Sequence, residues 1–483
     1  MDKRRFLAQL RSICGDNLIS DVPSLRVYET DGLTAKKQLP WLVALPSTIA
    51  EVQQIVRLCY QFEVPVVARG AGTGLSGGAM PHAEGLLLGL AKFNRILSVD
   101  EQNLLARVEP GVTNLAISEH VEEMDLYYAP DPSSQIACSI GGNVAENSGG
   151  VHCLKYGLTV HNVRKLKLVS PEGELYEVGS EALDSAGYDL LALLHGSEGM
   201  LGIVVEVTVK LLPKPESTCV VMAGFASVEA AAATVGDIIA SGILPAGLEM
   251  MDKPALQAAE AFVHAGYPTD AEALLLCELD GIEAELEIQL VNLKQILQEN
   301  GATSIVSAYD EEKRAQLWLG RKAAFPAVGR IAPDYYCMDG TIPRRKLAEV
   351  LAAISRLSEE FSLAVANVFH AGDGNLHPLI LYDANEGDEL QRAEAFGAKI
   401  LELCIESGGT ITGEHGVGIE KLDQMCIQFT DGELSIFHGI KSAFDEKSIL
   451  NPGKAVPTLN RCAEFGAMHV RRGQEKFPEL DRF

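Results

Sequence analysis

The sequence predicts an α+β protein of two main domains, and three features carry this prediction. Its 483 residues suffice for two or three domains of about 150 residues each. Hydrophobic residues make up 47% and charged residues 22%, which is typical of a globular protein. Strand-like and helix-like segments alternate, and their pattern changes at Pro213-Lys-Pro215. We therefore expect one domain at 39–215, a second at 216–450 and a tail at 451–483 that returns to the first domain.

The first domain is expected to follow an amphipathic helix and lead-in at 1–38. A strand in LPWLVALPST precedes a helix over IAEVQQIVRLCYQFE, which the Ser47-Thr48 pair can cap. Strands are expected at VPVVARG, GLLLGL, RILSVD and LLARVEPGV, and a helix at TNLAISEHVEEM. NVRKLKLVSPEGELYEV reads as a hairpin because of its Pro-Glu-Gly turn, and GIVVEVTVKLLPKP ends the domain.

The second domain alternates strands with longer helices. The strands are TCVVMAGF, EALLLCEL, ATSIVSAY, YYCMDGTIP, LAVANVFH and HPLILYD. The helices include VEAAAATVGDIIAS, IEAELEIQLVNLKQILQEN and RRKLAEVLAAISRLSEE. This order predicts helices packed against a mixed sheet.

Charge and cysteine usage exclude several function classes. Lys plus Arg number 40 against 66 Asp plus Glu, a formal net charge of −26 that repels nucleic acid and anionic lipid. The 10 cysteines include no Cys-x-x-Cys pair, which argues against iron–sulfur, zinc-ribbon and thioredoxin-type sites, and scattered thiols suit a reducing compartment. Arg11 interrupts the N-terminal apolar run, and no segment approaches about 20 apolar residues. We expect a cytoplasmic protein.

A glycine-rich loop, RGAGTGLSGG at 69–78, follows a predicted strand. Gly72, Gly74 and Gly77 match G-x-G-x-x-G. A Rossmann site requires a helix directly after this motif, but a strand begins at Gly85, so we discount that interpretation. The run of backbone N–H groups still suits an anion. A turn without a ligand is the alternative.

Two further loops are rich in Gly, Ser and Asn. They are PDPSSQIACSIGGNVAENSGG at 130–150 and HGSEGMLG at 195–202. Several such loops in one domain favour one large ligand wrapped by all of them. A dinucleotide with a second planar ring system fits this better than a mononucleotide does.

These loops, in this order, resemble the FAD-binding domain of the vanillyl-alcohol oxidase/p-cresol methylhydroxylase superfamily. The resemblance covers about 39–215. It implies that 69–78 hold the pyrophosphate, that 132–149 line the flavin and ribityl chain, and that residues near Gly202 lie on the adenine side. The loop has no His, although His82 lies near it, so we expect non-covalent FAD. The cofactor-binding residues so implied are Arg69, Gly70, Gly72, Thr73, Gly74, Leu75, Ser76, Gly77, Pro132, Gly142, Asn143, Asn147, Ser148, Gly149, Gly202, Ile203 and Asn451.

Histidines and an acid gather in two glycine-flanked motifs of the second domain. In HAGDGNLH, between two predicted strands, the glycines let the chain fold back so that His370 and His377 converge. GEHGVG at 413–418 places Glu414 beside His415. Two His and one Glu with an open position suit a catalytic divalent metal. A histidine taken alone is more often a hydrogen-bonded structural residue.

Both motifs resemble the C-terminal domain of FAD-linked 2-hydroxyacid dehydrogenases. By this resemblance His370, His377 and Glu414 bind a divalent metal, Zn or Mn, and His415 is the catalytic base. The resemblance also assigns Arg321 to the substrate carboxylate, because a guanidinium binds a carboxylate in a two-pronged geometry. The alternative for Arg321 is a solvated helix residue, and Lys322 and Arg330 are the nearby surface cations.

The family includes D-lactate dehydrogenases, D-2-hydroxyglutarate dehydrogenase and glycolate oxidase D subunits, and 320–345 and 463–483 resemble the last group most. This implies oxidation of glycolate, and of D-lactate, by hydride transfer to flavin N5. It also implies a second FAD-domain subunit and an iron–sulfur subunit as partners, with peripheral attachment to the inner face of the cell membrane. The alternatives are a D-2-hydroxyacid dehydrogenase acting alone, a metal-free flavin oxidase and a non-catalytic FAD subunit.

Two positions bear on the size of the substrate. The resemblance implies that relatives acting on D-2-hydroxyglutarate bind its distal carboxylate with two residues. These are a Thr one helical turn after the Arg and a Lys on the next strand. The corresponding residues are Phe325 and Cys337, neither of which binds a carboxylate strongly. We therefore expect D-2-hydroxyglutarate to be a poor substrate.

Overall fold

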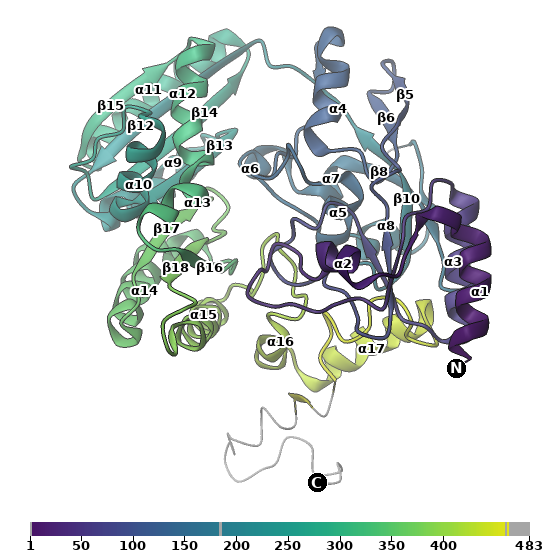
Figure 1. Ribbon diagram of the computed structural model, residues 1–483. Coiled ribbons are helices and arrows are strands. Elements are labelled where there is room, and N and C mark those ends of the chain that lie inside the picture. The colour runs from purple at the N-terminus through teal and green to yellow at the C-terminus, as the bar shows by residue number, and fades with distance from the viewer. Residues whose placement is uncertain (1, 183–185, 459–460, 463–483) are drawn as a thin grey trace. The chain divides into compact units, whose positions relative to one another are not determined.

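The computed structural model describes residues 2–182, 186–458 and 461–462 (Figure 1). The chain forms two compact units. Unit 1 comprises Met1–Ser148, Leu158–Pro213 and Glu414–Phe483, and unit 2 comprises Gly149–Gly157 and Lys214–Gly413. Unit 2 thus takes in a short segment before residue 158 and ends at Gly413, whereas the predicted second domain ran over 216–450. Most of the predicted tail, 463–483, lies outside the described residues.

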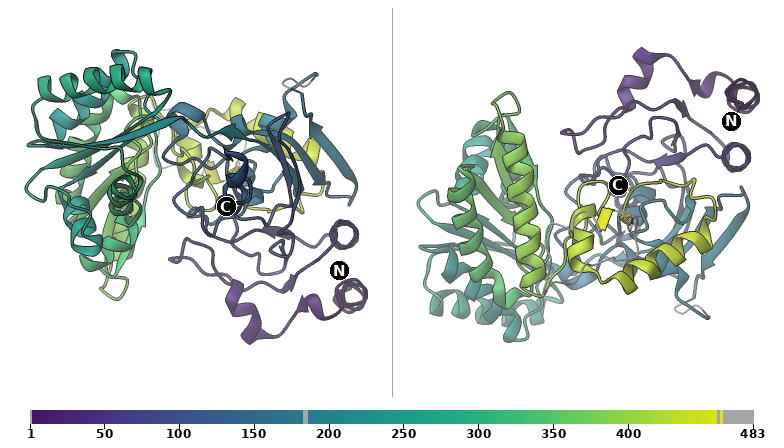
Figure 2. Two further views of the ribbon diagram at one scale, coloured as in Figure 1. Left: turned by 90° about the horizontal axis from the view of Figure 1, so that it is seen from above. Right: turned by 90° about the horizontal axis from the view of Figure 1, so that it is seen from below.

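The first sheet of unit 1 has the strand order β1-β2-β4-β3, and β2 and β3 both run parallel to β4. Helices α1 and α3 lie side by side beside it (Figures 1 and 2). Thr48 caps α3 by accepting from the Glu51 N–H, as the sequence predicted. Val52, Ile55 and Cys59 recur at helical spacing and are fully buried. The elements are α1 (Lys3–Cys14), β1 (Leu18–Ile19), α2 (Val22–Leu25), β2 (Leu42–Ala44), α3 (Ile49–Phe62), β3 (Val66–Arg69) and β4 (Leu86–Gly89).

The second sheet of unit 1 has the order β5-β6-β10-β8-β9 and is antiparallel, and the predicted hairpin is β8–β9. Leu166, Leu168 and Val207 are fully buried in the core that this sheet forms. Its elements are β5 (Ile96–Asp100), β6 (Leu105–Val108), α4 (Asn114–Val121), α5 (Ile140–Glu146), α7 (Thr159–Asn162), β8 (Val163–Val169), β9 (Leu175–Gly179), α8 (Leu190–Leu194) and β10 (Ile203–Lys210). A two-stranded pair, β7 (Leu126–Tyr127) with β11 (Leu212–Pro213), completes the strands described for unit 1.

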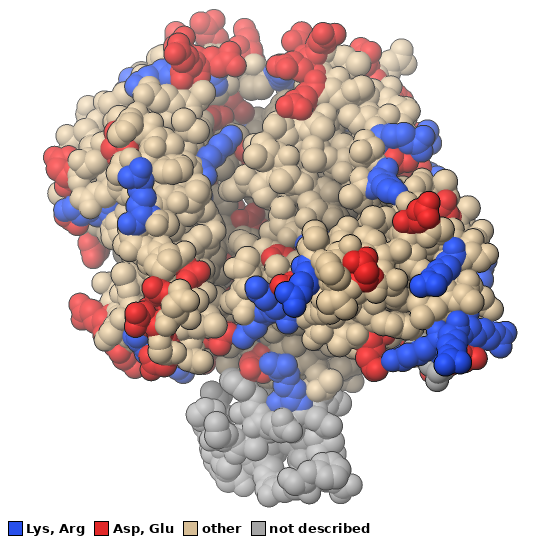
Figure 3. All heavy atoms as spheres, in the orientation of Figure 1, with Lys and Arg blue, Asp and Glu red and all other residues tan. Residues whose placement is uncertain are grey.

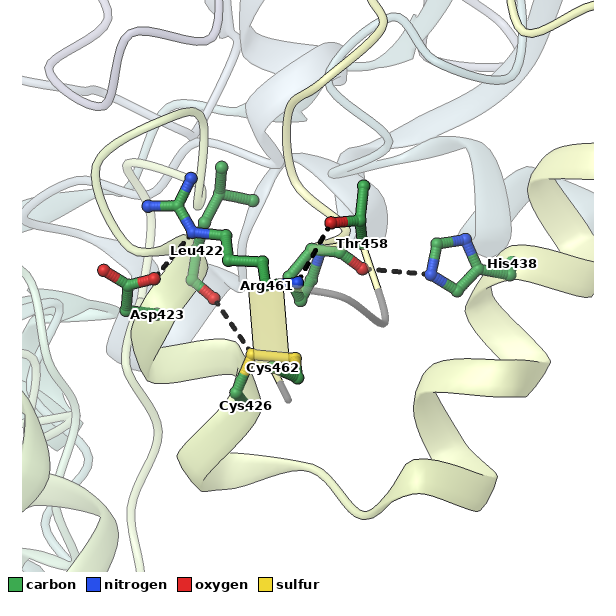
Figure 4. The surroundings of a disulfide bond; sticks show 8 residues. Leu422, Asp423, Cys426, His438, Thr458, Arg461 and Cys462 are labelled. Carbon is green, nitrogen blue, oxygen red and sulfur yellow. Dashed lines mark hydrogen bonds and ion pairs between the residues drawn. A yellow bond between two sulfur atoms is a disulfide. The ribbon is translucent and has the colours of Figure 1, made fainter. Parts of the chain in front are cut away.

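The C-terminal segment of unit 1 contains α16 (Leu422–Gln428) and α17 (Asp431–Phe444). Ile440 and Phe444 of α17 pack against the core of the second sheet. Beyond α17, Leu450 forms a parallel bridge with Val66 of β3. A disulfide joins Cys426 of α16 to Cys462 (Figure 4). The sequence had suggested only scattered thiols, and the other eight cysteines are buried thiols outside this disulfide.

Unit 2 is built on one seven-stranded sheet of order β15-β12-β14-β13-β17-β18-β16. Helices α9, α10, α11, α12 and α15 pack against its strands, and α14 packs against α9 and α15. The strands are β12 (Ser217–Phe225), β13 (Gly247–Asp252), β14 (Ala273–Gly281), β15 (Ala302–Ala308), β16 (Asp334–Cys337), β17 (Val365–Phe369) and β18 (Pro378–Tyr382). The helices are α6 (Cys153–Tyr156), α9 (Val228–Ala240), α10 (Lys253–Val263), α11 (Glu283–Glu299), α12 (Glu311–Lys322), α13 (Ala324–Ala327), α14 (Leu347–Phe361) and α15 (Glu389–Glu406).

The surface carries charged side chains of both signs, as the 40 Lys and Arg and the 66 Asp and Glu of the sequence lead one to expect. Acidic groups and clusters of Lys and Arg are interspersed on the face shown in Figure 3. Among the helices of the described residues, none is both long and apolar enough to cross a membrane.

Candidate functional site

The first glycine-rich loop leaves β3 and approaches the second loop closely. A Cβ at Gly70 would collide with the Oγ of Ser139, so only glycine allows this approach. The predicted ligand residue Arg69 uses its guanidinium to hold the lead-in: Nη1 donates to the carbonyls of Thr30 at 2.7 Å and Tyr28 at 3.3 Å. After residue 78 no helix intervenes before β4 begins at Leu86, as expected for a non-Rossmann loop.

The second loop contains a helix, α5, that was not expected from the sequence. Ser139 caps it by accepting from the Gly142 N–H, and Asn147 ends it in the left-handed conformation. Asn143 is buried and its amide bonds to Asn114 and Ser148. Two of the predicted cofactor residues, Asn143 and Asn147, therefore hold the shape of the loop.

Some buried polar atoms of unit 1 have no hydrogen-bond partner among the described residues. They include Ser76 Oγ, Glu146 Oε2, His195 Nε2 and Asn451 Oδ1. Ser76, Glu146 and His195 come from the three glycine-rich loops, one from each. Each unpaired buried group costs about 1–3 kcal/mol. This pattern fits a ligand with several polar groups distributed along its length, as FAD has.

The end of the GEHGVG motif packs onto these loops within unit 1. Glu198 accepts from the N–H groups of Val417 at 2.7 Å and Gly418 at 2.8 Å. A Cβ at Gly416 would collide with Glu146 Oε2. The motif was predicted only as part of the metal site, whereas Gly416 and Gly418 also pack against the glycine-rich loops of unit 1.

Burial shifts the pKa values of the acids and of one lysine in this region. It raises the pKa of Glu198, and burial together with the charge of Glu198 raises the pKa of Glu146 well above its ordinary value. Lys454 donates to the carbonyl of Gly78 at 2.9 Å, and burial lowers its pKa to about 8. Asn451 bonds the same carbonyl at 2.9 Å and that of Glu198 at 2.6 Å. These groups join the C-terminal segment to the first and third loops.

In unit 2 a buried carboxylate connects the two predicted functional residues Arg321 and His370. Glu249 Oε2 accepts from Arg321 Nε at 2.8 Å, and Glu249 Oε1 lies 2.7 Å from His370 Nδ1. Arg321 and Glu249 are each 1% exposed, so Arg321 is not a solvated helix residue. Arg321 Nη2 lies 2.7 Å from Oε2 but forms no aligned hydrogen bond with any described residue. One buried donor is therefore left for a ligand.

The two histidines of HAGDGNLH converge as the sequence predicted. The chain turns between β17 and β18: the Gly374 N–H donates to the His370 carbonyl, and the His370 N–H donates to the Asn375 carbonyl. The ring centroids of His370 and His377 lie 5.1 Å apart. His377 Nδ1 lies 3.3 Å from the Met338 carbonyl, so in both histidines Nδ1 faces an acceptor oxygen and carries a proton, and Nε2 lies on the other side of the ring.

Glu414 and His415 open the C-terminal segment of unit 1. Their side chains lie side by side, with His415 Nε2 3.7 Å from Glu414 Oε1. The preceding residue, Gly413, ends unit 2, and its N–H donates to the Asp339 carbonyl at 2.9 Å and carboxylate at 3.1 Å. Asp339 is fully buried and also accepts from Asn375 Nδ2 at 2.9 Å. No sequence motif indicates either Asp339 or Glu249.

Two family models together match most of the chain. FAD binding domain matches residues 40–179, and FAD linked oxidases, C-terminal domain, matches residues 214–455. The chain belongs to the FAD-linked oxidase family. FAD is accordingly its cofactor, and it is an oxidoreductase.

Curated relatives cover the chain almost completely. It is 59% identical over 484 residues to the Glycolate oxidase subunit GlcD of Escherichia coli, covering 100% of this chain and 97% of the relative. It is 41% identical to the subunit of the same name in Bacillus subtilis, covering 92% and 95%. It is 34% identical to a D-lactate dehydrogenase of Anaerostipes hadrus, covering 94% and 96%.

Solved structures confirm the predicted fold class. p-Cresol methylhydroxylase with substrate bound matches at a TM-score of 0.78 and 18% identity, covering 95% of this chain and 97% of that one. Alkyldihydroxyacetonephosphate synthase matches at 0.73 and 18%, covering 94% and 85%. At this identity the likeness concerns the fold alone.

Proposed function

We propose that the protein oxidises a small 2-hydroxy acid to its 2-oxo acid, with glycolate as the preferred substrate and D-lactate as the second. The observation that carries this is the buried Arg321, whose Nη2 donor lacks an aligned partner beside the converging His370 and His377. A 2-hydroxy acid offers a carboxylate for the guanidinium and a hydroxyl for the histidine-rich side. The names of the relatives, glycolate oxidase subunit and D-lactate dehydrogenase, support the same substrate class.

A divalent metal, Zn or Mn, is proposed on His370, His377 and Glu414. Two imidazoles and one carboxylate form a donor set suited to either ion. His370 Nδ1 donates to Glu249 Oε1, and His377 Nδ1 donates to the Met338 carbonyl. Each ring would therefore bind the metal through the lone pair of its Nε2.

Each of the proposed site residues has its own role in the reaction. FAD supplies the hydride acceptor, and the metal supplies a Lewis acid that makes the substrate hydroxyl more acidic. Arg321 binds the substrate carboxylate and fixes the orientation of the molecule. His415 accepts the hydroxyl proton on a ring nitrogen.

The pocket residues favour a short substrate. The ring of Phe325 lies edge-on to His377, with centroids 6.1 Å apart, and edge-on to Tyr335 at 6.0 Å. Cys337 is buried and its thiol lies 3.4 Å from the Met338 carbonyl. A second carboxylate placed there would lose its hydration without gaining a strong partner, which costs several kcal/mol, about a thousandfold or more in discrimination.

The names of the relatives also support the proposal that this chain is one subunit of a larger complex. Relatives in two organisms are named as subunits. We infer that this chain works with a second FAD-domain subunit and an iron–sulfur subunit, which pass its electrons on and hold it at the inner face of the cell membrane. Co-purification from native cells tests this, and recovery of the chain alone with full acceptor activity would contradict it.

The substrate proposal is tested by kcat/KM with an artificial dye acceptor. Glycolate and D-lactate are expected to be turned over, and D-2-hydroxyglutarate to be about a thousandfold poorer or worse. A preference for the dicarboxylate would overturn the assignment of Phe325 and Cys337 and the choice of glycolate.

A further inference from the structure

Glu249 is a buried acid that the sequence patterns did not indicate. It lies in β13, where all six residues are buried. Its two carboxylate oxygens have different partners: Oε2 accepts from Arg321 Nε at 2.8 Å, and Oε1 lies 2.7 Å from His370 Nδ1. The three residues come from β13, from α12 and from the end of β17, so only the folded sheet brings them together.

A second buried acid on the same sheet shows what distinguishes Glu249. In the β13–β14 register, Gly247 pairs with Glu278 and Glu249 pairs with Leu276, so Glu249 and Glu278 project from the same face of the sheet. Glu278 also bridges α12 and a histidine: it accepts from Trp318 Nε1 at 2.5 Å and lies 3.0 Å from His152. Its partners have no proposed part in the reaction, whereas those of Glu249 both do.

We propose that Glu249 is a positioning residue that sets the substrate-binding guanidinium of Arg321 and the metal-binding imidazole of His370 at once. This rests on the proposed function of that site. Glu249 Oε2 lies 2.8 Å from Nε and 2.7 Å from Nη2, which fixes the plane of the guanidinium, and Nη2, which makes no aligned hydrogen bond within the described residues, is the donor for the substrate carboxylate. Glu249 Oε1 keeps the His370 proton on Nδ1, so that Nε2 offers the metal its lone pair. Carboxylate binding and metal binding therefore depend on one side chain.

The substitution Glu249→Gln tests this because it keeps the size and removes one acceptor. A glutamine has a single acceptor oxygen, so it satisfies the donor of Arg321 or that of His370, but not both. The affinity for Zn or Mn, measured by titrating the metal-stripped protein, is expected to fall about 10- to 100-fold. KM for glycolate is expected to rise about tenfold or more at saturating metal, while the FAD content stays that of the wild type.

Glu278→Gln is the matched control, since it alters a buried acid on the same face of the same sheet. It is expected to leave the metal affinity and KM within about twofold of the wild type. Equal losses in both variants would show a general effect on folding and overturn the positioning role. Wild-type metal affinity and KM in Glu249→Gln would overturn it as well, with the proposed function untouched. A wild-type protein that binds no metal and oxidises no 2-hydroxy acid would overturn both proposals.

Discussion

Replacing Arg321 by lysine isolates the contribution of its planar guanidinium to substrate binding. The guanidinium is 1% exposed and donates through Nε to Glu249. Lysine keeps the positive charge beside Glu249, so the buried acid retains a cationic partner, but it lacks the Nη2 donor assigned to the substrate carboxylate. Losing one hydrogen bond between charged groups costs about 1.5–3 kcal/mol, which corresponds to about a 10- to 150-fold loss in affinity.

The assay is steady-state oxidation of glycolate with a dye acceptor. We expect Arg321→Lys to raise KM by about 10- to 150-fold and to lower kcat less, because the carboxylate is bound in the ground state and the transition state alike. FAD content and the thermal unfolding midpoint serve as folding checks. Arg330→Lys, at an exposed residue of the short helix Val328–Arg330, is the control and should match the wild type. An unchanged KM in Arg321→Lys would refute the assignment of Arg321 to the carboxylate.

Three further predictions follow from single residues. His377→Ala should lose bound divalent metal and turnover while keeping FAD, whereas His438→Ala, at a partly buried histidine bonded to the Pro457 carbonyl, should keep all three; metal retained in His377→Ala would contradict the site. Burial lowers the pKa of His195 to about 4, so the folded chain binds fewer protons there than the unfolded chain, and unfolding becomes easier as the pH falls from about 6.5 towards 4. The free energy of unfolding should fall by about 3 kcal/mol over this range, and by less in His195→Asn, as measured by denaturant unfolding at neutral and acidic pH. An equal dependence of the unfolding free energy on pH in both proteins would argue against this role of His195. Phe325→Thr should improve kcat/KM for D-2-hydroxyglutarate relative to glycolate by about tenfold or more, and an unchanged ratio would remove Phe325 from the specificity pocket.

Local patterns sufficed for much of the fold. The capped helix α3, the β8–β9 hairpin and the strands flanking HAGDGNLH follow from periodicity, turn residues and caps. Helix α5 was missed because Gly141 and Gly142 have low helix propensity. The cap at Ser139 and the burial of Ile140 and Val144 offset this low helix propensity. The burial arises only in the folded chain, so the sequence does not reveal it.

The site was predictable where its residues share a motif, and not where they meet through the sheet. His370 and His377 lie on one turn, so their convergence follows from glycine spacing. Glu249 lies 72 residues from Arg321 and 121 from His370 and sits in an apolar strand, where sequence alone gives no sign of its partners. The Cys426–Cys462 disulfide is hidden for the same reason, with a sequence separation of 36 between its cysteines.

Anaerobic bleaching of the bound flavin tests the central claim most directly, because it needs no electron acceptor and no partner subunit. The purified protein, with FAD and Zn or Mn bound, is mixed with excess glycolate, D-lactate or D-2-hydroxyglutarate without oxygen, and the visible flavin absorbance is followed. We expect glycolate to bleach it fastest, D-lactate more slowly and D-2-hydroxyglutarate hardly at all. Flavin that stays oxidised with both small acids, or that is bleached first by the dicarboxylate, would contradict the proposed reaction.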